Sequence, residues 1–468
     1  MSLFHEILPS FEGEDGFSFS GGHLFTNGNK AFIISQEHGT SILLSSELAN
    51  NIKERSFPFG LRRKLIQRGF GKALKSRPVV QDYKESIMPY FFMIDLTRCC
   101  VLRCKYCFRS LTHEDTTISS EMLEKICEYI FEYCKKYKRQ SISIQVWGGE
   151  PTLAYDKILF IDDFFSKRSI DAKICMETSG ATLTQEMVQE FAKRRMGVGI
   201  SIDGMPDLHN SHRPLASGKE SWPNVSRGLK LLKENGYDGK FTSISVVSKE
   251  SAPYIKEIVS YFWRDLQLPQ FKFNVVKCHE RMDEDKLGLG LKETAKFAND
   301  LFDAMVDMYR SGGTSIETNL RTKALNLIER KCSSICLSRG CMGGRKIVSF
   351  DNQGSIFTCD MTDVAENSFG NVLENRDLVE VLSSASKCHP YFHKRQEPKC
   401  QSCPWSFFCR GGCSSSVRFC KGSYEGVDEH ECVINHIIYP RLIELLLTYP
   451  EIFQMMISSD VYTAQLEI

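Results

Sequence analysis

Short apolar runs separated by amphipathic segments recur through the middle of the chain. Six runs are rich in β-branched and aromatic residues, a composition typical of strands. They fall at residues 90–95, 141–147, 172–178, 198–203, 241–247 and 271–276. Between them, residues 120–138 and 225–235 carry apolar positions at helical spacing. Strands that alternate with helices predict an α/β fold with a parallel sheet built from βαβ units.

The two ends of the chain show other patterns. Residues 23–35 predict two strands joined at an Asn-Gly turn, and residues 45–57 and 60–71 predict short helices, the first with a serine cap. An apolar-striped segment near the C-terminus, interrupted close to Pro450, predicts a helical tail docked on the body. We divide the 468 residues into an N-terminal module (1–85), an α/β region (86–315), a Cys-rich region (316–435) and the tail (436–468).

Charge and hydropathy exclude several classes of protein. The net charge is +1, so no global field attracts nucleic acid or an anionic membrane. The N-terminus lacks the basic start and apolar run of a signal peptide, and no apolar stretch approaches the ~20 residues of a membrane span. We therefore expect a cytoplasmic protein with reduced thiols, in which the 19 cysteines favour metal sites over disulfides.

Four cysteines crowd into "CCVLRCKYCF" at residues 99–108. Cys100, Cys104 and Cys107 fit the spacing C-x3-C-x2-C, whereas Cys99 lies one position out of register. Three thiolates leave one iron of a cubane cluster open to a substrate, as in catalytic metal sites generally. The alternative is a buried cysteine cluster without metal.

This motif resembles the signature of radical S-adenosylmethionine (SAM) enzymes. The resemblance implies a partial (β/α)6 TIM-like barrel, a 4Fe-4S cluster on the three cysteines, and SAM on the open iron. It also implies that Tyr106 lies against the adenine and that the "GGEP" motif contacts the amino end of SAM. By the same resemblance, Ser201 lies near the ribose and Arg213 binds the carboxylate. The implied SAM-binding residues are Tyr106, Gly148, Gly149, Glu150, Ser201 and Arg213.

A second set of cysteines resembles the SPASM extension of certain radical SAM enzymes, which holds two auxiliary 4Fe-4S clusters. The resemblance assigns Cys341, Cys359 and Cys413 to the first auxiliary cluster, completed by Cys336 or Cys332. The second would be held by Cys400, Cys403, Cys409 and Cys432. A pair of zinc sites is the alternative for these spacings. With the SAM-binding cluster, the chain is expected to hold three 4Fe-4S clusters.

Asp360 directly follows a predicted cluster ligand. In the sulfatase-maturing branch of the family, an aspartate at this place acts as the base on the substrate. A carboxylate beside a cluster could take a proton as an oxidised product forms. We therefore name Asp360 as the candidate catalytic residue.

The N-terminal module resembles the small winged-helix-like domains that bind leader peptides in ribosomal peptide pathways. Its arrangement ahead of the barrel is similar to maturases of His-Xaa-Ser repeat peptide systems. We therefore hypothesise an enzyme that oxidatively modifies or crosslinks a precursor peptide or protein. Its expected partners are that substrate and an electron donor such as flavodoxin or ferredoxin, without nucleic acid or membrane. The alternatives are an anaerobic sulfatase-maturing enzyme that generates formylglycine, a non-catalytic multi-cluster electron-transfer protein, and a zinc-stabilised binding module.

Overall fold

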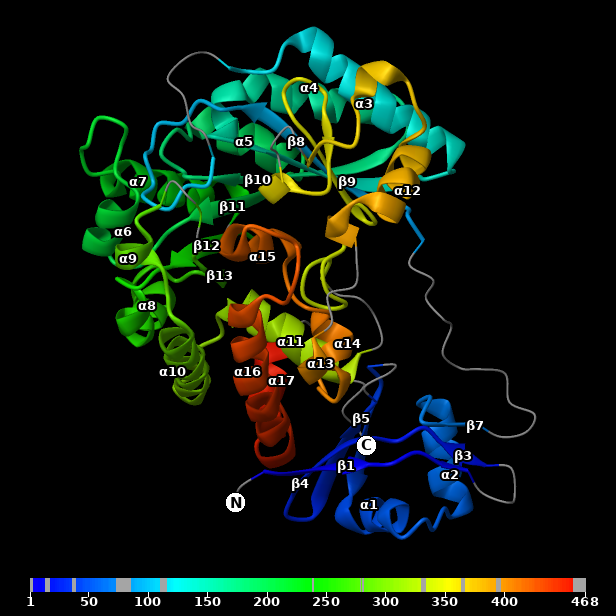
Figure 1. Ribbon diagram of the computed structural model, residues 1–468. Coiled ribbons are helices and arrows are strands. Elements are labelled where there is room, and N and C mark those ends of the chain that lie inside the picture. The colour runs from blue at the N-terminus through cyan, green and yellow to red at the C-terminus, as the bar shows by residue number, and fades with distance from the viewer. Residues whose placement is uncertain are drawn as a thin grey trace.

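The computed structural model describes residues 3–12, 17–35, 39–72, 86–109, 116–237, 240–277, 279, 282–329, 334–362, 367–392 and 397–457. Cys332 and Cys278 lie outside the described residues. Figure 1 shows the barrel strands at one end of the molecule and the N-terminal module at the other, with C-terminal helices between them.

A nine-stranded sheet forms the centre of the barrel (Figure 1). Its first seven strands along the chain pair in parallel, each with the next. These strands are β8 (Phe91–Thr97), β9 (Ser141–Gly148), β10 (Asp171–Thr178), β11 (Gly197–Ser201), β12 (Thr242–Val247), β13 (Gln270–Val275) and β14 (Ile316–Glu317). The predicted α/β fold and partial barrel are confirmed, and the six expected strands correspond to β8 through β13.

Helices connect consecutive strands of the barrel. They are α3 (Ser120–Lys136), α4 (Tyr155–Ser166), α5 (Gln185–Lys193), α6 (Pro206–His212), α7 (Trp222–Leu232), α8 (Ile255–Ser260), α9 (Glu284–Leu287) and α10 (Leu291–Arg310). Side-chain caps fix two starts: Ser119 accepts from the Met122 amide, and Thr184 accepts from the Met187 amide. Shorter turns are η1 (Pro151–Ala154), η2 (Lys233–Tyr237), η3 (Ala252–Tyr254) and η4 (Tyr261–Asp265).

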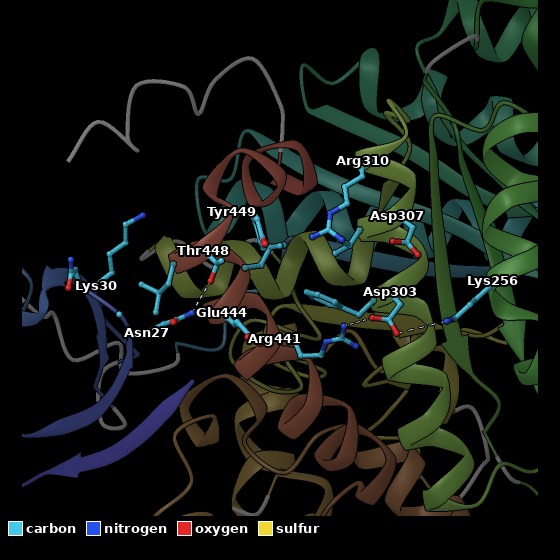
Figure 2. Close-up of a pocket in the computed structure, with 16 residues that line it drawn as sticks. Asn27, Lys30, Lys256, Asp303, Asp307, Arg310, Arg441, Glu444, Thr448 and Tyr449 are labelled. Atoms are coloured by element: carbon cyan, nitrogen blue, oxygen red, sulfur yellow. Dashed lines mark hydrogen bonds and ion pairs between the residues drawn. The ribbon is translucent and has the colours of Figure 1, made fainter. Parts of the chain in front are cut away.

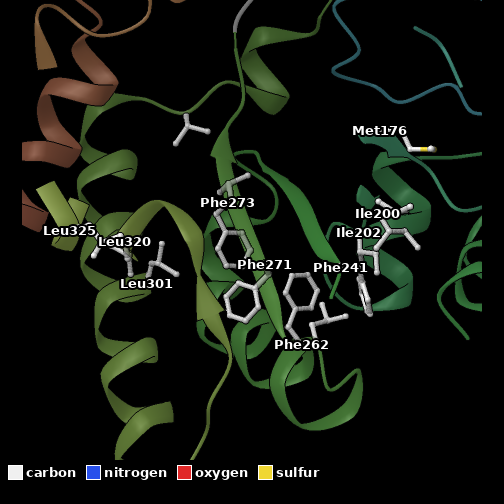
Figure 3. Close-up of a cluster of buried hydrophobic side chains, with 14 of the residues drawn as sticks. Met176, Ile200, Ile202, Phe241, Phe262, Phe271, Phe273, Leu301, Leu320 and Leu325 are labelled. Carbon is white, nitrogen blue, oxygen red and sulfur yellow. The ribbon is translucent and has the colours of Figure 1, made fainter. Parts of the chain in front are cut away.

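The core between the sheet and its helices is aromatic around β13. Figure 3 shows Phe271 and Phe273 on this strand beside Phe262. The rings of Phe262 and Phe273 are stacked, with centroids 5.8 Å apart. Side chains alternate between the two faces of a strand. Lys272 and Asn274, which alternate with the two phenylalanines along β13, therefore point into the barrel. The packed aromatic layer thereby fixes the direction of two polar side chains.

The Cys-rich region adds strands to the same sheet. β15 (Ile347–Phe350) pairs in parallel with β8, and β16 (Ile356–Phe357) pairs antiparallel with β15. On the opposite edge, β14 follows residue 315 and pairs with β13. The sheet therefore continues across the boundary that we predict at residue 315.

The rest of the C-terminal region consists of short helices and loops. Its elements are α11 (Thr318–Ile328), η5 (Asp360–Thr362), η7 (Val372–Glu374), α12 (Leu378–Cys388), η8 (Pro390–Phe392), α13 (Pro398–Gln401), α14 (Ser406–Cys409), α15 (Ser414–Lys421), α16 (Glu429–Thr448) and α17 (Pro450–Ile457). The break near Pro450 occurs between α16 and α17. Both helices bury apolar side chains against the body of the protein, so the tail is docked as expected.

The N-terminal module contains a four-stranded sheet in the order β1-β4-β5-β6, with α1 (Ser46–Lys53) and α2 (Phe59–Gln67). Its strands are β1 (Phe4–Leu8), β4 (Gly22–Asn27), β5 (Lys30–Ile34) and β6 (Ser41–Ser45). A second small sheet joins β2 (Phe11–Glu12), β3 (Ser18–Phe19) and β7 (Gly71–Lys72). The predicted hairpin is confirmed, since β4 and β5 pair antiparallel with Asn27 opposite Lys30. Ser45 caps α1, as the sequence predicts.

The module is packed into the main core. Phe25, Phe32 and Ile34 belong to the large apolar cluster that also contains the barrel core. The ring of Phe25 stacks on Trp405 at 5.6 Å, and Trp405 stacks on Tyr439 at 4.8 Å. The N-terminal sheet therefore rests directly on the loop that carries Cys403 and Cys409.

A groove of about 760 Å³ runs beside this junction, between the β4–β5 turn and helices α10 and α16 (Figure 2). Across it, the Asn27 amide donates to Thr448 Oγ1 at 2.8 Å. Arg441 pairs with Asp303, and Lys256 lies 3.9 Å from the same carboxylate. These ion pairs join α16 and α8 to α10, whereas the stacking of Phe25 on Trp405 attaches the N-terminal module.

Candidate active site

One cavity of about 560 Å³ lies where the carboxyl ends of the barrel strands face the C-terminal region. Both predicted groups of functional residues line it. From the barrel these are Cys100, Cys104, Tyr106, Cys107, Gly148, Gly149, Glu150, Ser201 and Arg213, and from the C-terminal region Cys336, Asp360, Cys409 and Cys413. Active sites of parallel α/β barrels form at this end of the strands. The sequence motifs therefore converge on one space although they lie hundreds of residues apart.

The three thiols of the first motif lie in the loop after β8. Burial, together with the nearby Glu150, raises the pKa of Cys100 to about 12. Burial likewise raises the pKa of Cys104 to about 12, against the opposing influence of Arg213. Thiolates here are therefore costly unless a cation compensates them. An iron–sulfur cluster supplies that cation, so the donor set fits the group that the motif implies.

Glu150 is anchored at the end of β9 and is only 1% exposed. Its Oε1 accepts from Thr152 at 2.7 Å and from Thr178 at 2.6 Å. Its Oε2 accepts from the Ser179 amide at 2.8 Å and from the Ser179 hydroxyl at 2.5 Å. These donors orient the carboxylate, which lines the cavity and can receive an ammonium group there.

Backbone packing requires glycine at position 149, whether or not this residue contacts a ligand. A Cβ at this position would lie 2.2 Å from the backbone oxygen of Cys99. The Glu150 amide also donates to that oxygen at 2.8 Å. The glycine thus lets the GGEP turn pack against the cysteine loop, which fixes Glu150 relative to the thiols.

Arg213 and Tyr106 meet at Asp203, a residue that our sequence analysis does not assign. Arg213 Nε lies 3.0 Å from Asp203 Oδ2, and the Tyr106 hydroxyl donates to the same oxygen. Burial opposes ionisation of Asp203, but Arg213 holds its pKa below the usual value. The guanidinium also approaches Cys104 Sγ, with Nη1 at 3.9 Å. Asp203 therefore fixes both predicted SAM-binding side chains, and its place in "SIDG" is the signal that could have identified it.

Asp360 faces the cavity from η5, next to Cys359. Burial raises its pKa, and Arg109 and Lys272 partly oppose that shift. Arg109 itself pairs with the buried Asp95 and lies 4.0 Å from the centre of the Trp147 ring. The Asp360 carboxyl is thus a partly buried acid with a raised pKa, and such perturbed groups are common at functional sites.

Glu177 is a second acid that lines the cavity, and the sequence analysis assigns it no role. It lies at the end of β10, and burial raises its pKa to about 7 against the influence of Lys272. Among the described residues, its Oε2 is buried without a hydrogen-bond partner. The neighbouring strand makes room for it, because a Cβ at Gly199 would lie 1.9 Å from this oxygen.

Four cysteines of the C-terminal region gather on the far side of Asp360. Cys336, Cys341 and Cys413 interact electrostatically with one another, and Cys359 interacts with Cys341, Cys413 and Asp360. Burial raises the pKa of Cys359. The structure thus places Cys336 with the other three predicted ligands, whereas Cys332 lies outside the described residues.

The other four predicted ligands, Cys400, Cys403, Cys409 and Cys432, line a second, smaller cavity. His436, one helical turn after Cys432 on α16, also lines it. Its Nε2 lies 3.7 Å from Cys403 Sγ, and its Nδ1 lies 3.7 Å from Cys432 Sγ. Hydrogen bonding to these thiols raises the pKa of His436 to about 10. The second C-terminal cysteine set therefore surrounds a small space of its own, and Cys409 lines both this space and the main cavity.

Among the residues that the structure describes, no three His, Cys, Asp or Glu side chains close in on one point as ligands of a single metal ion. The part of the chain that is described also has no helix with the length and apolar character of a membrane span.

The part of the chain that forms the barrel matches a known superfamily of enzymes. The sequence model of the Radical SAM superfamily matches residues 94–262, which span β8 through η4 and include the three-cysteine loop. The expectation of an enzyme is thereby confirmed, and the non-catalytic electron-transfer alternative is excluded. A 4Fe-4S cluster and SAM are what the superfamily implies.

The chain is similar in sequence to anaerobic sulfatase-maturating enzymes. The chain is 24% identical over 339 residues to a cysteine-type anaerobic sulfatase-maturating enzyme of Clostridium perfringens, covering 70% of this chain and 88% of the relative. It is 26% identical over 367 residues to a serine-type enzyme of Bacteroides thetaiotaomicron, covering 70% and 85%.

Solved structures show the same fold. Tagged anSMEcpe with bound AdoMet superposes with a TM-score of 0.67 at 21% identity, covering 79% of this chain and 98% of that one. Streptococcus suis SuiB bound to S-adenosylmethionine superposes with a TM-score of 0.54 at 17% identity, covering 92% and 99%.

Proposed function

We propose that the protein uses SAM to oxidise a side chain of a precursor peptide and to join it into a crosslink. The observation that carries this proposal is the single cavity between the three-cysteine loop, Asp360 and the first C-terminal cysteine set. A substrate side chain in that space would lie within reach of a radical source, a base and an electron acceptor at once.

The cysteines define where the chemistry would occur. Cys100, Cys104 and Cys107 would hold a 4Fe-4S cluster that binds SAM, and together these groups would supply the radical chemistry that removes a hydrogen atom from a substrate C–H bond. Glu150 would bind the ammonium of SAM through its oriented carboxylate. Arg213 has its Nε engaged by Asp203, and its remaining N–H groups can receive the carboxylate of SAM. Tyr106 would contact the adenine of SAM, and Ser201 would lie near its ribose.

The second half of the reaction needs a base and an electron acceptor. After hydrogen abstraction, closing a bond between the substrate carbon and a second substrate group releases one electron and one proton. Asp360 would take the proton, since it faces the cavity and its raised pKa makes its carboxylate a better proton acceptor. The electron would pass to an auxiliary cluster held by Cys336, Cys341, Cys359 and Cys413, which adjoin Asp360. The reaction then balances as a two-electron oxidation of the peptide.

The N-terminal module supports a peptide substrate with a separate recognition segment. The match to anSMEcpe leaves about a fifth of this chain outside, whereas the match to SuiB covers 92% of it. SuiB has also been solved with the precursor peptide SuiA bound. In the present chain, β1 is an edge strand that exposes Phe4 (58%) and Ile7 (61%). An exposed apolar edge strand is a surface on which an extended peptide can add.

The proposal is tested by producing the enzyme together with the peptide from a short reading frame beside its gene. The expected product has lost two hydrogens, and tandem mass spectrometry should show two residues that no longer fragment apart. An unmodified peptide, recovered while the enzyme cleaves SAM normally, would contradict that peptide as the substrate.

Recognition by the module is tested by changing the exposed edge. Phe4→Ser with Ile7→Ser should weaken processing of the full precursor about tenfold or more, because two apolar contacts of ~1 kcal/mol each are lost. Phe59→Ser on α2 is the matched control, since Phe59 is 82% exposed and lies away from the edge strand. Equal processing by both variants would assign the module a structural role only.

Formylglycine formation is the second candidate, favoured by the sulfatase-maturating relatives. The Cp18Cys peptide, which has been solved bound to anSMEcpe, is a suitable probe. Oxidation of that peptide at its cysteine by this protein would replace the crosslinking proposal.

A further inference from the structure

Tyr391 lies against the first C-terminal cysteine set. Its hydroxyl oxygen is 2.8 Å from Cys341 Sγ, and the residue is 4% exposed. Tyr391 also interacts electrostatically with Cys359 and Cys413, so it borders the set as a whole. It belongs to η8, which is separated in sequence from every cysteine of that set.

The position of the hydroxyl is fixed by the packing around it. The Tyr391 ring meets Tyr424 edge-on at 5.7 Å and Phe392 at 5.5 Å. On the backbone side, a Cβ at Gly343 would lie 2.1 Å from the hydroxyl oxygen. The absence of a side chain at Gly343 thus leaves the space that the Tyr391 hydroxyl occupies.

We propose that Tyr391 donates its hydroxyl hydrogen to Cys341 Sγ and so raises the reduction potential of the first auxiliary cluster. The inference rests on the proposed function, because it requires that cluster. A metal-bound thiolate carries no proton, so the phenol must be the donor. Hydrogen bonds to the ligand sulfurs are among the factors that set the potential of such clusters.

The direction follows from charge. The reduced cluster carries one more negative charge than the oxidised cluster, and a donor to its ligand stabilises the more negative state more strongly. One electron enters and no proton moves, so Tyr391 acts on the cluster without taking part in the reaction. A higher potential favours transfer of the electron from the substrate radical, the step that completes product formation.

The test is a redox titration of the reconstituted full-length protein, followed by electron paramagnetic resonance. Cys341→Ser identifies the signal of the first auxiliary cluster. Tyr391→Phe keeps the ring and removes the donor, and it should shift this one midpoint potential to a lower value. Tyr424→Phe is the matched control, because Tyr424 belongs to the same aromatic group but its hydroxyl bonds to Asn367 at 3.0 Å. That control should leave the potential in place.

A second variant approaches the same bond from the other side. Gly343→Ala keeps Tyr391 and displaces its hydroxyl, so it should also lower the potential. An unchanged potential in Tyr391→Phe, with iron content equal to the parent, overturns the inference. So does an equal shift in Tyr391→Phe and Tyr424→Phe. A parent protein whose iron content shows no cluster at these cysteines overturns the auxiliary-cluster proposal itself, a result that iron analysis tells apart from the other two.

Discussion

The two sides of the cavity are built differently. On the proposed SAM side, the buried acids Glu150 and Asp203 have their oxygens bound by donors within the protein. On the side that Lys272 faces, which is the proposed substrate side, Glu177 keeps one buried oxygen without a partner among the described residues, and Lys272 is the cation that most directly offsets it. A site for a constant cosubstrate can be fully organised in advance. A site for a variable substrate leaves polar groups that the substrate must satisfy.

The largest expected effect concerns the three-cysteine loop on the SAM side. Changing Cys100, Cys104 and Cys107 together to Ala should abolish 5′-deoxyadenosine formation, because no site for the SAM-binding cluster remains. Iron content should fall from about twelve to about eight per chain if two auxiliary clusters persist. Colourless parent protein with stoichiometric zinc would instead support the zinc alternative.

Glu150 tests whether the SAM side is as rigid as its hydrogen bonds indicate. Glu150→Gln places an amide donor among groups that already donate, and it removes the charge that attracts an ammonium. A buried, hydrogen-bonded charge pair that loses one partner is weakened by about 2–5 kcal/mol, so SAM cleavage should fall about 10³-fold. Glu121→Gln, at an exposed i,i+4 pair on α3, should change nothing. Normal cleavage by Glu150→Gln would mean that SAM binds elsewhere.

A change at Asp360 should distinguish SAM cleavage from modification of the peptide. Asp360→Asn keeps the size of the side chain and removes the base, so 5′-deoxyadenosine formation should persist while modified peptide falls about 10²-fold. Liquid chromatography with mass spectrometry measures both products in one sample. Parent-rate product from Asp360→Asn would show that another group accepts the proton, and Glu177 is then the next candidate.

Local patterns predicted the scaffold well, because strand composition and cap residues such as Ser119 and Ser45 act over a few positions. Short motifs also predicted the side chains that line the cavity. The partners of those side chains were not predicted. Asp203 binds Tyr106 across 97 residues, and Tyr391 reaches Cys341 across 50. Such pairs depend on how separate elements pack, and nothing in the spacing of one segment encodes the neighbour it will meet.

The smallest expected effect tests the substrate side through stability. The pKa of Glu177 is raised from 4.5 to about 7, first by burial. Between these values the folded protein holds a proton that the unfolded chain releases, so stability falls as the pH rises from 4.5 to about 7. Glu177→Gln removes the titration and keeps the shape. It should therefore be about 1–3 kcal/mol more stable than the parent at pH 8, with the difference vanishing near pH 4.5.

Denaturant unfolding of the reconstituted protein at both pH values measures this difference. Glu186→Gln on α5 is the matched control, because that side chain is exposed and should give no pH-dependent gain. Equal stability of Glu177→Gln and parent at pH 8 would show that the carboxyl is already compensated. The two sides of the cavity would then be equally well organised, and Glu177 would no longer be a candidate for a group that binds the substrate. Glu177→Gln could be more stable than the parent at pH 8 only while the precursor peptide is absent. That result would show that the substrate itself supplies the missing partner of Glu177.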